Sequence, residues 1–192
     1  MSVDSVGGVA PPIEEEAALV KRAKAGDTSV WSDWHDQCYP LLYRYAYSRL
    51  NKHEDAEDVA SQVFLEAIKA IGRYRYSGRP ILAWFYGIAR HLVSRRRREA
   101  GKTAPIADVE QLSIHPAPHD EDVILSNILV RTAMERLKPE HRELLTLRFL
   151  LDLSAREVAA LLGKKEAAIY SLQVRALGAL RREIPDDSWH FL

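Results

Sequence analysis

The sequence has little cysteine and no long apolar run. Cys38 is the only cysteine among 192 residues, which excludes a disulfide framework and a cysteine-based zinc site and favours a reducing compartment, by default the cytoplasm. No apolar run approaches the length that spans a bilayer, and the start, MSVDSVGGVAPPIEEE, lacks the basic and apolar regions of a signal peptide. We therefore expect a protein that is neither exported nor inserted into a membrane.

Motifs of catalysis and of metal or cofactor binding are missing as well. There is no glycine-rich phosphate loop, no HExxH pair and no nucleophile elbow, and the seven histidines are scattered. His35 and Cys38 lie three residues apart on an expected helix, but two ligands do not close a metal site, so core packing is the better interpretation. We predict a protein that is not an enzyme and that uses no cofactor or metal.

A surplus of charge of one sign is also lacking, because 27 basic and 27 acidic residues cancel. The charges are nevertheless segregated along the chain. Residues 54–66 carry five acidic and no basic side chains, whereas residues 73–102 carry nine basic and one acidic. Residues 106–124 are again purely acidic, and residues 131–182 carry eleven basic against six acidic side chains. Two basic regions separated by an acidic connector indicate two separate contacts with a polyanion.

The stretch 154–182 has the pattern of two short helices joined by a tight turn. Ser154 and Glu157 match a capping box at the start of the first helix, and Gly163 supplies the left-handed position that ends it. The second helix, from about Glu166, has an apolar stripe that we expect to pack back on the first helix. This is a helix-turn-helix signature. The stripe consists of Ile169, Leu172, Ala176 and Leu180.

The other face of this second helix has small residues in its centre and basic ones at its edge. Such a face lets a helix lie deep in a DNA major groove while guanidinium groups bind the phosphates. Any pair of packed helices in a bundle can show the same cap, glycine and stripe, so this stretch alone leaves DNA reading and plain bundle packing both open. The face consists of Ala167, Ser171, Val174 and Gly178, flanked by Tyr170, Arg175, Arg181 and Arg182.

The rest of the chain predicts further helices in two groups. Pro40 should kink or split the second helix, and the proline-containing stretch after the fourth has no helical period, which is typical of a linker. We predict an all-α fold of two small helical domains joined by an acidic linker, the C-terminal one a helix-turn-helix four-helix domain. The expected helices are 13–26, 28–50, 55–71, 81–99, 123–137 and 139–151, and the expected divisions are a tail at 1–12, a domain at 13–99, the linker at 100–120, a domain at 121–184 and a tail at 185–192.

The helix expected at 55–71 is apolar on more than one side. Val59, Val63, Ala67 and Ile71 form one stripe. Other apolar residues beside the acids indicate a surface for a partner. Alternatively, the acids match the helix dipole and the extra apolar groups touch neighbouring helices, and the spacing leaves both interpretations open. The residues off the stripe are Phe64, Leu65 and Ile68.

Aromatic and basic residues alternate in the next stretch, GRYRYSGRP at 72–80. These are the ingredients of a single-strand platform, since bases stack on aromatic rings while arginine holds the backbone. The alternative is that the tyrosines close a loop over the core. The following helix buries Ile81, Phe85, Ile88 and Leu92 at helical spacing. Its other face, which fits a helix laid on nucleic acid, consists of Trp84, Gly87, His91, Ser94, Arg95 and Arg98.

The order of these motifs resembles the extracytoplasmic-function (ECF) sigma factors, the compact two-domain class of the sigma-70 family. The similarity rests on DAEDVASQVFLEAIKAI, the aromatic and basic stretch, ILAWFYGIARHLVSRRRRE, the acidic linker, and LKPEHRELLTLRFLLDLSAREVAALLG with the final helix. It covers about Trp31 to Arg182, nearly the whole chain.

The resemblance implies a factor that binds core RNA polymerase and directs promoter-specific transcription initiation. In that family the first domain binds the clamp helices of the beta prime subunit and melts the minus-10 element of promoter DNA. The second domain reads the minus-35 element and touches the beta flap. The resemblance also implies that an anti-sigma factor, or the protein's own tails, keeps the protein inactive, in the bacterial cytoplasm or held at the membrane by the anti-sigma factor.

The resemblance assigns site residues to three surfaces. The core-polymerase-binding residues are Asp55, Glu57, Asp58, Gln62 and Leu65. The minus-10 DNA-binding residues are Tyr74, Arg75, Tyr76, Arg79, Trp84, Tyr86, Arg90, His91 and Arg95. The minus-35 DNA-binding residues are Lys164, Lys165, Glu166, Tyr170, Ser171 and Arg175.

The recognition helix departs from the family pattern at Tyr170, Leu172 and Val174, where lysine or arginine is usual. Fewer bidentate donors predict a larger contribution from DNA shape and phosphate contacts. A stand-alone helix-turn-helix regulator is an alternative, but it would have no use for the acidic and apolar helix. A helical module that sequesters another regulator is a second alternative, which predicts no sequence-specific DNA contact.

Overall fold

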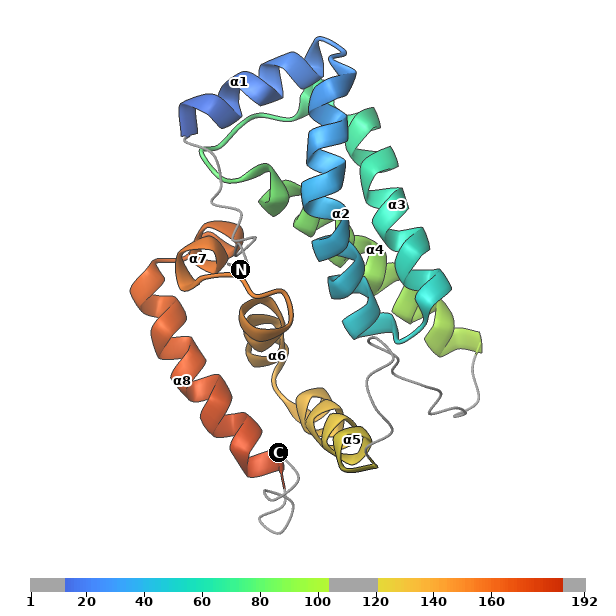
Figure 1. Ribbon diagram of the computed structural model, residues 1–192, viewed down its shortest axis with the longest axis vertical. Coiled ribbons are helices and arrows are strands. Elements are labelled where there is room, and N and C mark those ends of the chain that lie inside the picture. The colour runs from blue at the N-terminus through green and yellow to red at the C-terminus, as the bar shows by residue number, and fades with distance from the viewer. Residues whose placement is uncertain (1–12, 104–120, 185–192) are drawn as a thin grey trace, which may run out of the picture. The chain divides into compact units, whose positions relative to one another are not determined.

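The computed structural model describes residues 13–103 and 121–184, and within these ranges it contains helices and no strand (Figure 1). This confirms the all-α prediction. The chain divides into two compact units, which we call unit 1, mainly α1 to α4, and unit 2, mainly α5 to α8. The predicted tails, 1–12 and 185–192, and residues 104–120 of the predicted linker lie outside the described residues.

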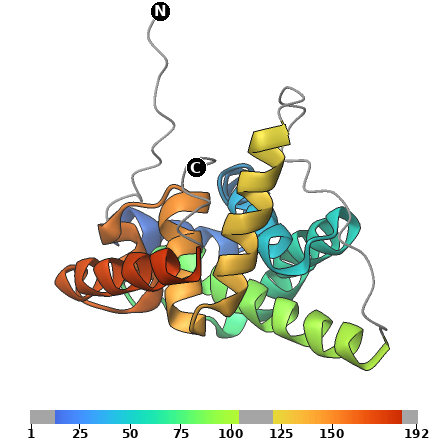
Figure 2. The same cartoon turned by 90° about the horizontal axis from the view of Figure 1, so that it is seen from below.

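Unit 1 is a bundle in which α2 (Thr28–Leu50), α3 (His53–Ala70) and α4 (Ile81–Thr103) pack on one another (Figures 1 and 2). Only two residues join α2 to α3, so the two helices are antiparallel neighbours. Asn51 makes this turn with a left-handed φ of 57° and donates its backbone N–H to Tyr47 O at 2.9 Å.

Aromatic side chains fill the core of unit 1. Phe85 of α4 is fully buried, with its ring 5.8 Å from Trp34 of α2 and 5.2 Å from Phe64 of α3. Trp31 adds an edge contact to Trp34 at 5.3 Å. Aromatic pairs at these separations add to the stabilisation that burial provides.

The core-packing interpretation of His35 and Cys38 is confirmed for Cys38, which is buried in this core. It is wrong for His35, which is exposed and lies against the rings of Tyr39 and Phe64.

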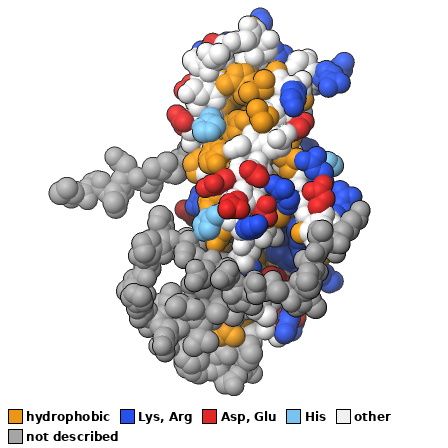
Figure 3. Space-filling view, turned by 90° about the vertical axis from the view of Figure 1, so that its right-hand side faces the viewer, with side chains coloured by type: hydrophobic (Ala, Val, Ile, Leu, Met, Phe, Trp, Pro, Cys, Tyr) orange, Lys and Arg blue, Asp and Glu red, His pale blue; other side chains and the backbone are white. Residues whose placement is uncertain are grey.

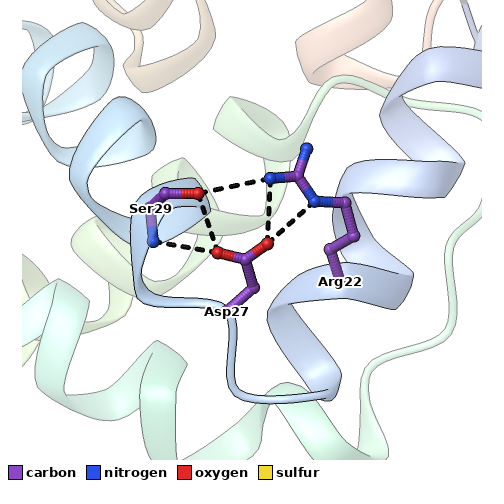
Figure 4. Close-up of polar contacts among 3 residues, drawn as sticks. All are labelled: Arg22, Asp27 and Ser29. Carbon is purple, nitrogen blue, oxygen red and sulfur yellow. Dashed lines mark hydrogen bonds and ion pairs between the residues drawn. The ribbon is translucent and has the colours of Figure 1, made fainter.

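The helix α1 (Ile13–Lys24) is joined to α2 through a polar cluster at the start of α2 (Figure 4). Asp27 caps α2 by accepting the backbone N–H of Ser29 at 3.0 Å and its hydroxyl at 2.7 Å. Arg22 of α1 donates to the same carboxylate at 2.9 Å. These hydrogen bonds hold the pKa of Asp27 below its usual value, and the hydrogen bond from the Ser29 hydroxyl is the largest cause.

Pro40 lies inside α2, which continues unbroken to Leu50. Of the two outcomes predicted for Pro40, a kink or a split, the split is therefore excluded. A proline removes one backbone hydrogen bond, whereas Trp34, Cys38 and Leu42, on either side of it, are all buried in the same core. Packing on both sides keeps the two halves in one helix.

Two helix ends in unit 1 differ from the predicted bounds. The helix α3 begins at His53 and passes into a short 3-10 turn, η1 (Ile71–Arg73). The helix α4 runs to Thr103 instead of Glu99, so the first residues of the predicted linker, 100–103, are helical. Arginine and alanine are strong helix formers, so the run of arginines and the alanine that follows it favour continuation of the helix.

Unit 2 consists of α5 (Glu121–Arg136), α6 (Pro139–Leu145), η2 (Thr146–Leu150), α7 (Ala155–Leu162) and α8 (Glu166–Glu183). Leu144, Leu147, Val158 and Ile169 are its fully buried large side chains. Pro139 occupies the first turn of α6, as predicted. The predicted single helix over 139–151 changes to a π-helical turn at η2, a local irregularity that the apolar period does not reveal.

The helix-turn-helix has the predicted local chemistry. Ser154 N donates to Glu157 Oε2 at 2.7 Å, and Glu157 N donates to Ser154 Oγ at 3.2 Å, which completes the capping box. Gly163 has φ of 65°, the left-handed conformation that was predicted. The stripe of α8 packs mainly on α6 rather than on α7. The prediction that this stripe packs back on the first helix of the motif is therefore wrong, because α6 and α5 supply the main partners of α8.

Candidate protein and nucleic-acid interfaces

The helix α3 presents a mixed apolar and acidic surface. Val59, Val63 and Phe64 are buried, whereas Leu65 and Ile68 are 51% and 52% exposed. The interpretation that an off-stripe residue touches neighbouring helices is confirmed for Phe64. Leu65 and Ile68 face outward, and a partner for them stays a prediction. Figure 3 views the side of the molecule on which α3 lies and shows apolar side chains gathered there.

The acidic end of this surface is held by an arginine of α4. Arg96 lies 3.5 Å from Asp55 Oδ1 and donates to Asp58 Oδ2 at 2.8 Å. Gln62 donates to Glu66 at 2.8 Å. A groove of about 390 Å³ runs between α3 and α4, and its lining includes Asp58, Gln62, Leu65, Leu92, Arg95 and Arg96.

The predicted core-binding residues therefore share one surface, and the structure adds two residues to it. Asp55 is half-buried, Glu57 and Asp58 are exposed, and Gln62 and Leu65 follow along the same helix. Ile68 joins them because it lies three residues beyond Leu65. Helical spacing placed Arg95 and Arg98 of the same basic run on the DNA-facing side, and no local signal indicated that Arg96 would pair with Asp55 and Asp58.

The aromatic and basic stretch folds back on the first turn of α4. The ring of Tyr74 stacks on that of Trp84 with centroids 4.2 Å apart and planes at 21°. Burial and the negative charge of Glu16 raise the pKa of Tyr74. The interpretation that a tyrosine closes the loop holds for Tyr74, while Arg75 and Arg79 are exposed and Tyr76 is partly exposed.

The outer face of α4 is polar and basic, as predicted. Gly87, Arg90, His91 and Arg95 are exposed. Arg98 continues this face and is exposed too. Of the basic groups that the structure describes, only Arg79 is close enough to the stacked rings to act on the charge state of Tyr74. Arg95 and Arg98 extend the basic face further along α4, which suits a backbone of phosphates.

Tyr86 is a correction to the predicted minus-10 set. Its side chain is only 4% exposed, and its ring lies 4.7 Å from that of Tyr45 on α2. The helix α4 packs against both α2 and α3, so its buried sector is wider than the single predicted stripe and includes Ala89 and Val93. Tyr86 belongs to the core of unit 1 and has no free face for DNA.

The helix α8 exposes the predicted recognition face. Lys164, Lys165 and Glu166 are exposed at its start, and Ser171 and Arg175 are exposed along it. Val174, at 72% exposure, is the most exposed large apolar residue among those described.

Two polar side chains of this face are occupied locally. The Tyr170 hydroxyl donates to Glu166 Oε1 at 3.3 Å, and the Ser171 hydroxyl donates to Ala167 O at 3.0 Å. These two hydrogen bonds lower the number of side-chain donors that are free to contact base edges. A larger contribution of DNA shape to recognition stays a prediction. Leu177, 40% exposed, extends the apolar part of the face and was not predicted.

Two features were sought among the described residues and not found there. No cluster of three or more histidine, cysteine, aspartate or glutamate side chains is arranged to hold a metal ion within residues 13–103 and 121–184. In the same ranges no helix has the length and apolar character needed to cross a membrane.

Comparison with known protein families gives two matches in the expected order. The model described as "Sigma-70 region 2" matches residues 34–103, which covers most of α2 and all of α3 and α4. The model described as "Sigma-70, region 4" matches residues 128–180, which covers most of unit 2. The helix α1 lies outside both matches.

Curated relatives match over most of the chain. The ECF RNA polymerase sigma factor BldN of Streptomyces coelicolor is 40% identical over 178 residues, 88% of this chain and 66% of that protein, so the chain spans just under two thirds of it. The ECF RNA polymerase sigma factor SigD of Mycobacterium tuberculosis is 35% identical over 179 residues, 87% of this chain and 82% of that protein.

A solved structure shares the fold. The sigma factor RpoE of Bartonella quintana, solved in complex with the anti-sigma factor NepR, is 24% identical and covers 80% of this chain and 95% of its own, with a TM-score of 0.56. Sigma factors regulate transcription and are not classed as enzymes. The two region matches and the curated relatives show that the chain belongs to the ECF RNA polymerase sigma factors of the sigma-70 family.

Proposed function

We propose that this protein binds core RNA polymerase and directs it to promoters, with unit 1 opening the minus-10 element and unit 2 reading the minus-35 element. The observation that carries the proposal is that one chain has an exposed apolar and acidic surface on α3 and basic, exposed faces on α4 and α8. A stand-alone DNA-binding regulator needs only the last of these. The family membership supports the same assignment.

The surface of α3 is assigned to the clamp helices of the beta prime subunit. Leu65 and Ile68 provide apolar area that is half exposed in the free protein, and Glu57 and Asp58 provide negative charge at its end. Interfaces commonly combine an apolar centre with a polar rim. Unit 2 would also touch the beta flap.

The minus-10 and minus-35 surfaces are assigned to different units. Tyr74, Tyr76 and Trp84 would stack on bases of the opened strand, while arginines nearby bind its phosphates. The exposed face of α8 would lie in the major groove. The proposed domains, 13–99 and 121–184, follow the same division, with α4 extending to Thr103 into the linker expected at 100–120.

Control by an anti-sigma factor is part of the proposal. The related RpoE was solved with such a partner, and an anti-sigma factor that covers the α3 surface would prevent binding to polymerase. We further propose that the protein acts in the cytoplasm, that an anti-sigma factor can hold it at the membrane, and that the chain itself performs no catalysis.

The test is transcription in vitro with sigma-free core polymerase, the purified protein and sheared genomic DNA, followed by sequencing of transcript 5′ ends. We expect new start sites that share two short elements at constant spacing. The variant Arg175→Ala should lower use of these starts without changing the affinity for core polymerase. A protein that does not bind core polymerase would contradict the proposal and favour the stand-alone regulator. Binding to core polymerase without new starts would favour the interaction module.

A further inference from the structure

Glu16 of α1 is a buried carboxylate that no family match covers. Its side chain is 3% exposed, whereas the neighbouring Glu14 and Glu15 are exposed. Burying a carboxylate is unfavourable unless it gains hydrogen bonds or a compensating positive potential. Burial accordingly raises the pKa of Glu16, and a hydrogen bond from Ile81 opposes this.

The partner of Glu16 is the first residue of α4. The backbone N–H of Ile81 donates to Glu16 Oε1 at 2.5 Å, across 65 residues of sequence. The helix α4 has no acidic residue in its first turn, and Pro80 precedes it. A proline has no side-chain oxygen for capping. A carboxylate from α1 therefore supplies the cap that this helix lacks locally, and its charge suits the positive end of the helix dipole.

The position of this cap is tied to the proposed minus-10 surface. Trp84 lies three residues after Ile81, in the first turn of α4, and stacks on Tyr74 at 4.2 Å. The charge of Glu16 contributes to raising the pKa of both Tyr74 and Tyr76, after the larger effect of burial. Glu16 thus lies where α1, the stretch before α4 and the start of α4 meet.

We propose that Glu16 is a positioning residue for strand capture: by capping α4 it holds Trp84 and Tyr74 in the arrangement that receives the opened minus-10 strand. The inference rests on the proposed function and deepens it. It gives α1 a role in promoter opening, although α1 carries none of the predicted DNA-binding residues. Glu16 acts only through the rings and does not itself touch DNA.

The test compares variants as reconstituted holoenzymes on one mapped promoter. Three quantities are measured: affinity for core polymerase, affinity of the holoenzyme for the closed duplex at low temperature, and permanganate reactivity of minus-10 thymines. Glu16→Ala removes the cap, and we expect about fivefold less promoter opening, with the first two affinities unchanged within about twofold. Glu16→Gln keeps a carbonyl that can accept the Ile81 N–H, so it should restore opening. Glu15→Ala, on the exposed side of the same turn, is the matched control and should equal the wild type.

Several results would overturn the inference. These are equal opening by Glu16→Ala and the wild type, failure of Glu16→Gln to restore opening, or a parallel loss of core affinity, which would indicate a folding role only. If Glu16→Ala does not fold, Glu16→Asp, whose shorter side chain withdraws the acceptor, replaces it with the same expectations. A wild-type holoenzyme that opens no promoter would contradict the proposed function itself, and is thereby distinguished from a failure of the variants alone.

Discussion

The exposed apolar pair on α3 leads to a quantitative prediction for polymerase binding. Burying a leucine or isoleucine side chain contributes about 1.5–3 kcal/mol. Because Leu65 and Ile68 are 51% and 52% exposed, roughly half of that, about 1 kcal/mol each, is left for a partner to gain. Leu65→Ala should therefore weaken binding to core polymerase about fivefold, and the double variant with Ile68→Ala about thirtyfold.

Fluorescence anisotropy of labelled protein titrated with core polymerase measures this change directly. The buried half of each side chain also supports the fold, so the titration belongs at a temperature where circular dichroism shows both variants fully folded. Val174→Ala, which removes an even more exposed apolar side chain from α8, is the control and should leave the affinity for core polymerase unchanged. A double variant that is folded and binds as tightly as the wild type would refute the assignment of this surface.

Three further predictions concern chemical reactivity and stability. Burial raises the pKa of the Cys38 thiol to about 12, so iodoacetamide at pH 8 should label it only after unfolding in urea; rapid labelling of the folded protein would show that the core of unit 1 opens readily. The raised pKa also means that the folded state holds this proton more tightly, so stability should fall as the pH rises above 9.0, and Cys38→Ala should remove that contribution. Ser154→Ala should lower the free energy of unfolding of unit 2 by about 1 kcal/mol, measured by urea denaturation. Glu157→Ala should lower this free energy less when it is added to Ser154→Ala than when it is made in the wild type, since the two side chains form one capping box.

Local sequence signals were sufficient where a structure depends on neighbouring residues. The capping box at Ser154 and the left-handed Gly163 are set by contacts within a few residues, and both were predicted. The buried stripes of α3 and α8 follow from helical spacing, which depends only on backbone geometry. The resemblance to the sigma factors then supplied the order of the surfaces.

Prediction failed where the outcome depended on which elements pack together. Tyr86 is an aromatic residue of the kind that contacts nucleic acid, but α2 and α3 pack against α4 and leave Tyr86 buried. The local pattern left open whether Pro40 kinks or splits its helix, and the helix is continuous because the core on both sides of Pro40 outweighs one lost hydrogen bond. No local sequence pattern predicted the π-helical turn at Thr146–Leu150 either.

The sequence by itself determined the helices, their division into two groups and the family. The reason is that the amphipathic period, the helix caps and the order of the motifs depend on residues that are close together in the sequence. Only the tertiary structure decided that Glu16 caps a helix 65 residues away and that Arg96 holds the acids of α3. It also decided that Tyr74 lies on Trp84. These contacts join residues that are distant in sequence, and their energies exist only once the helices have packed.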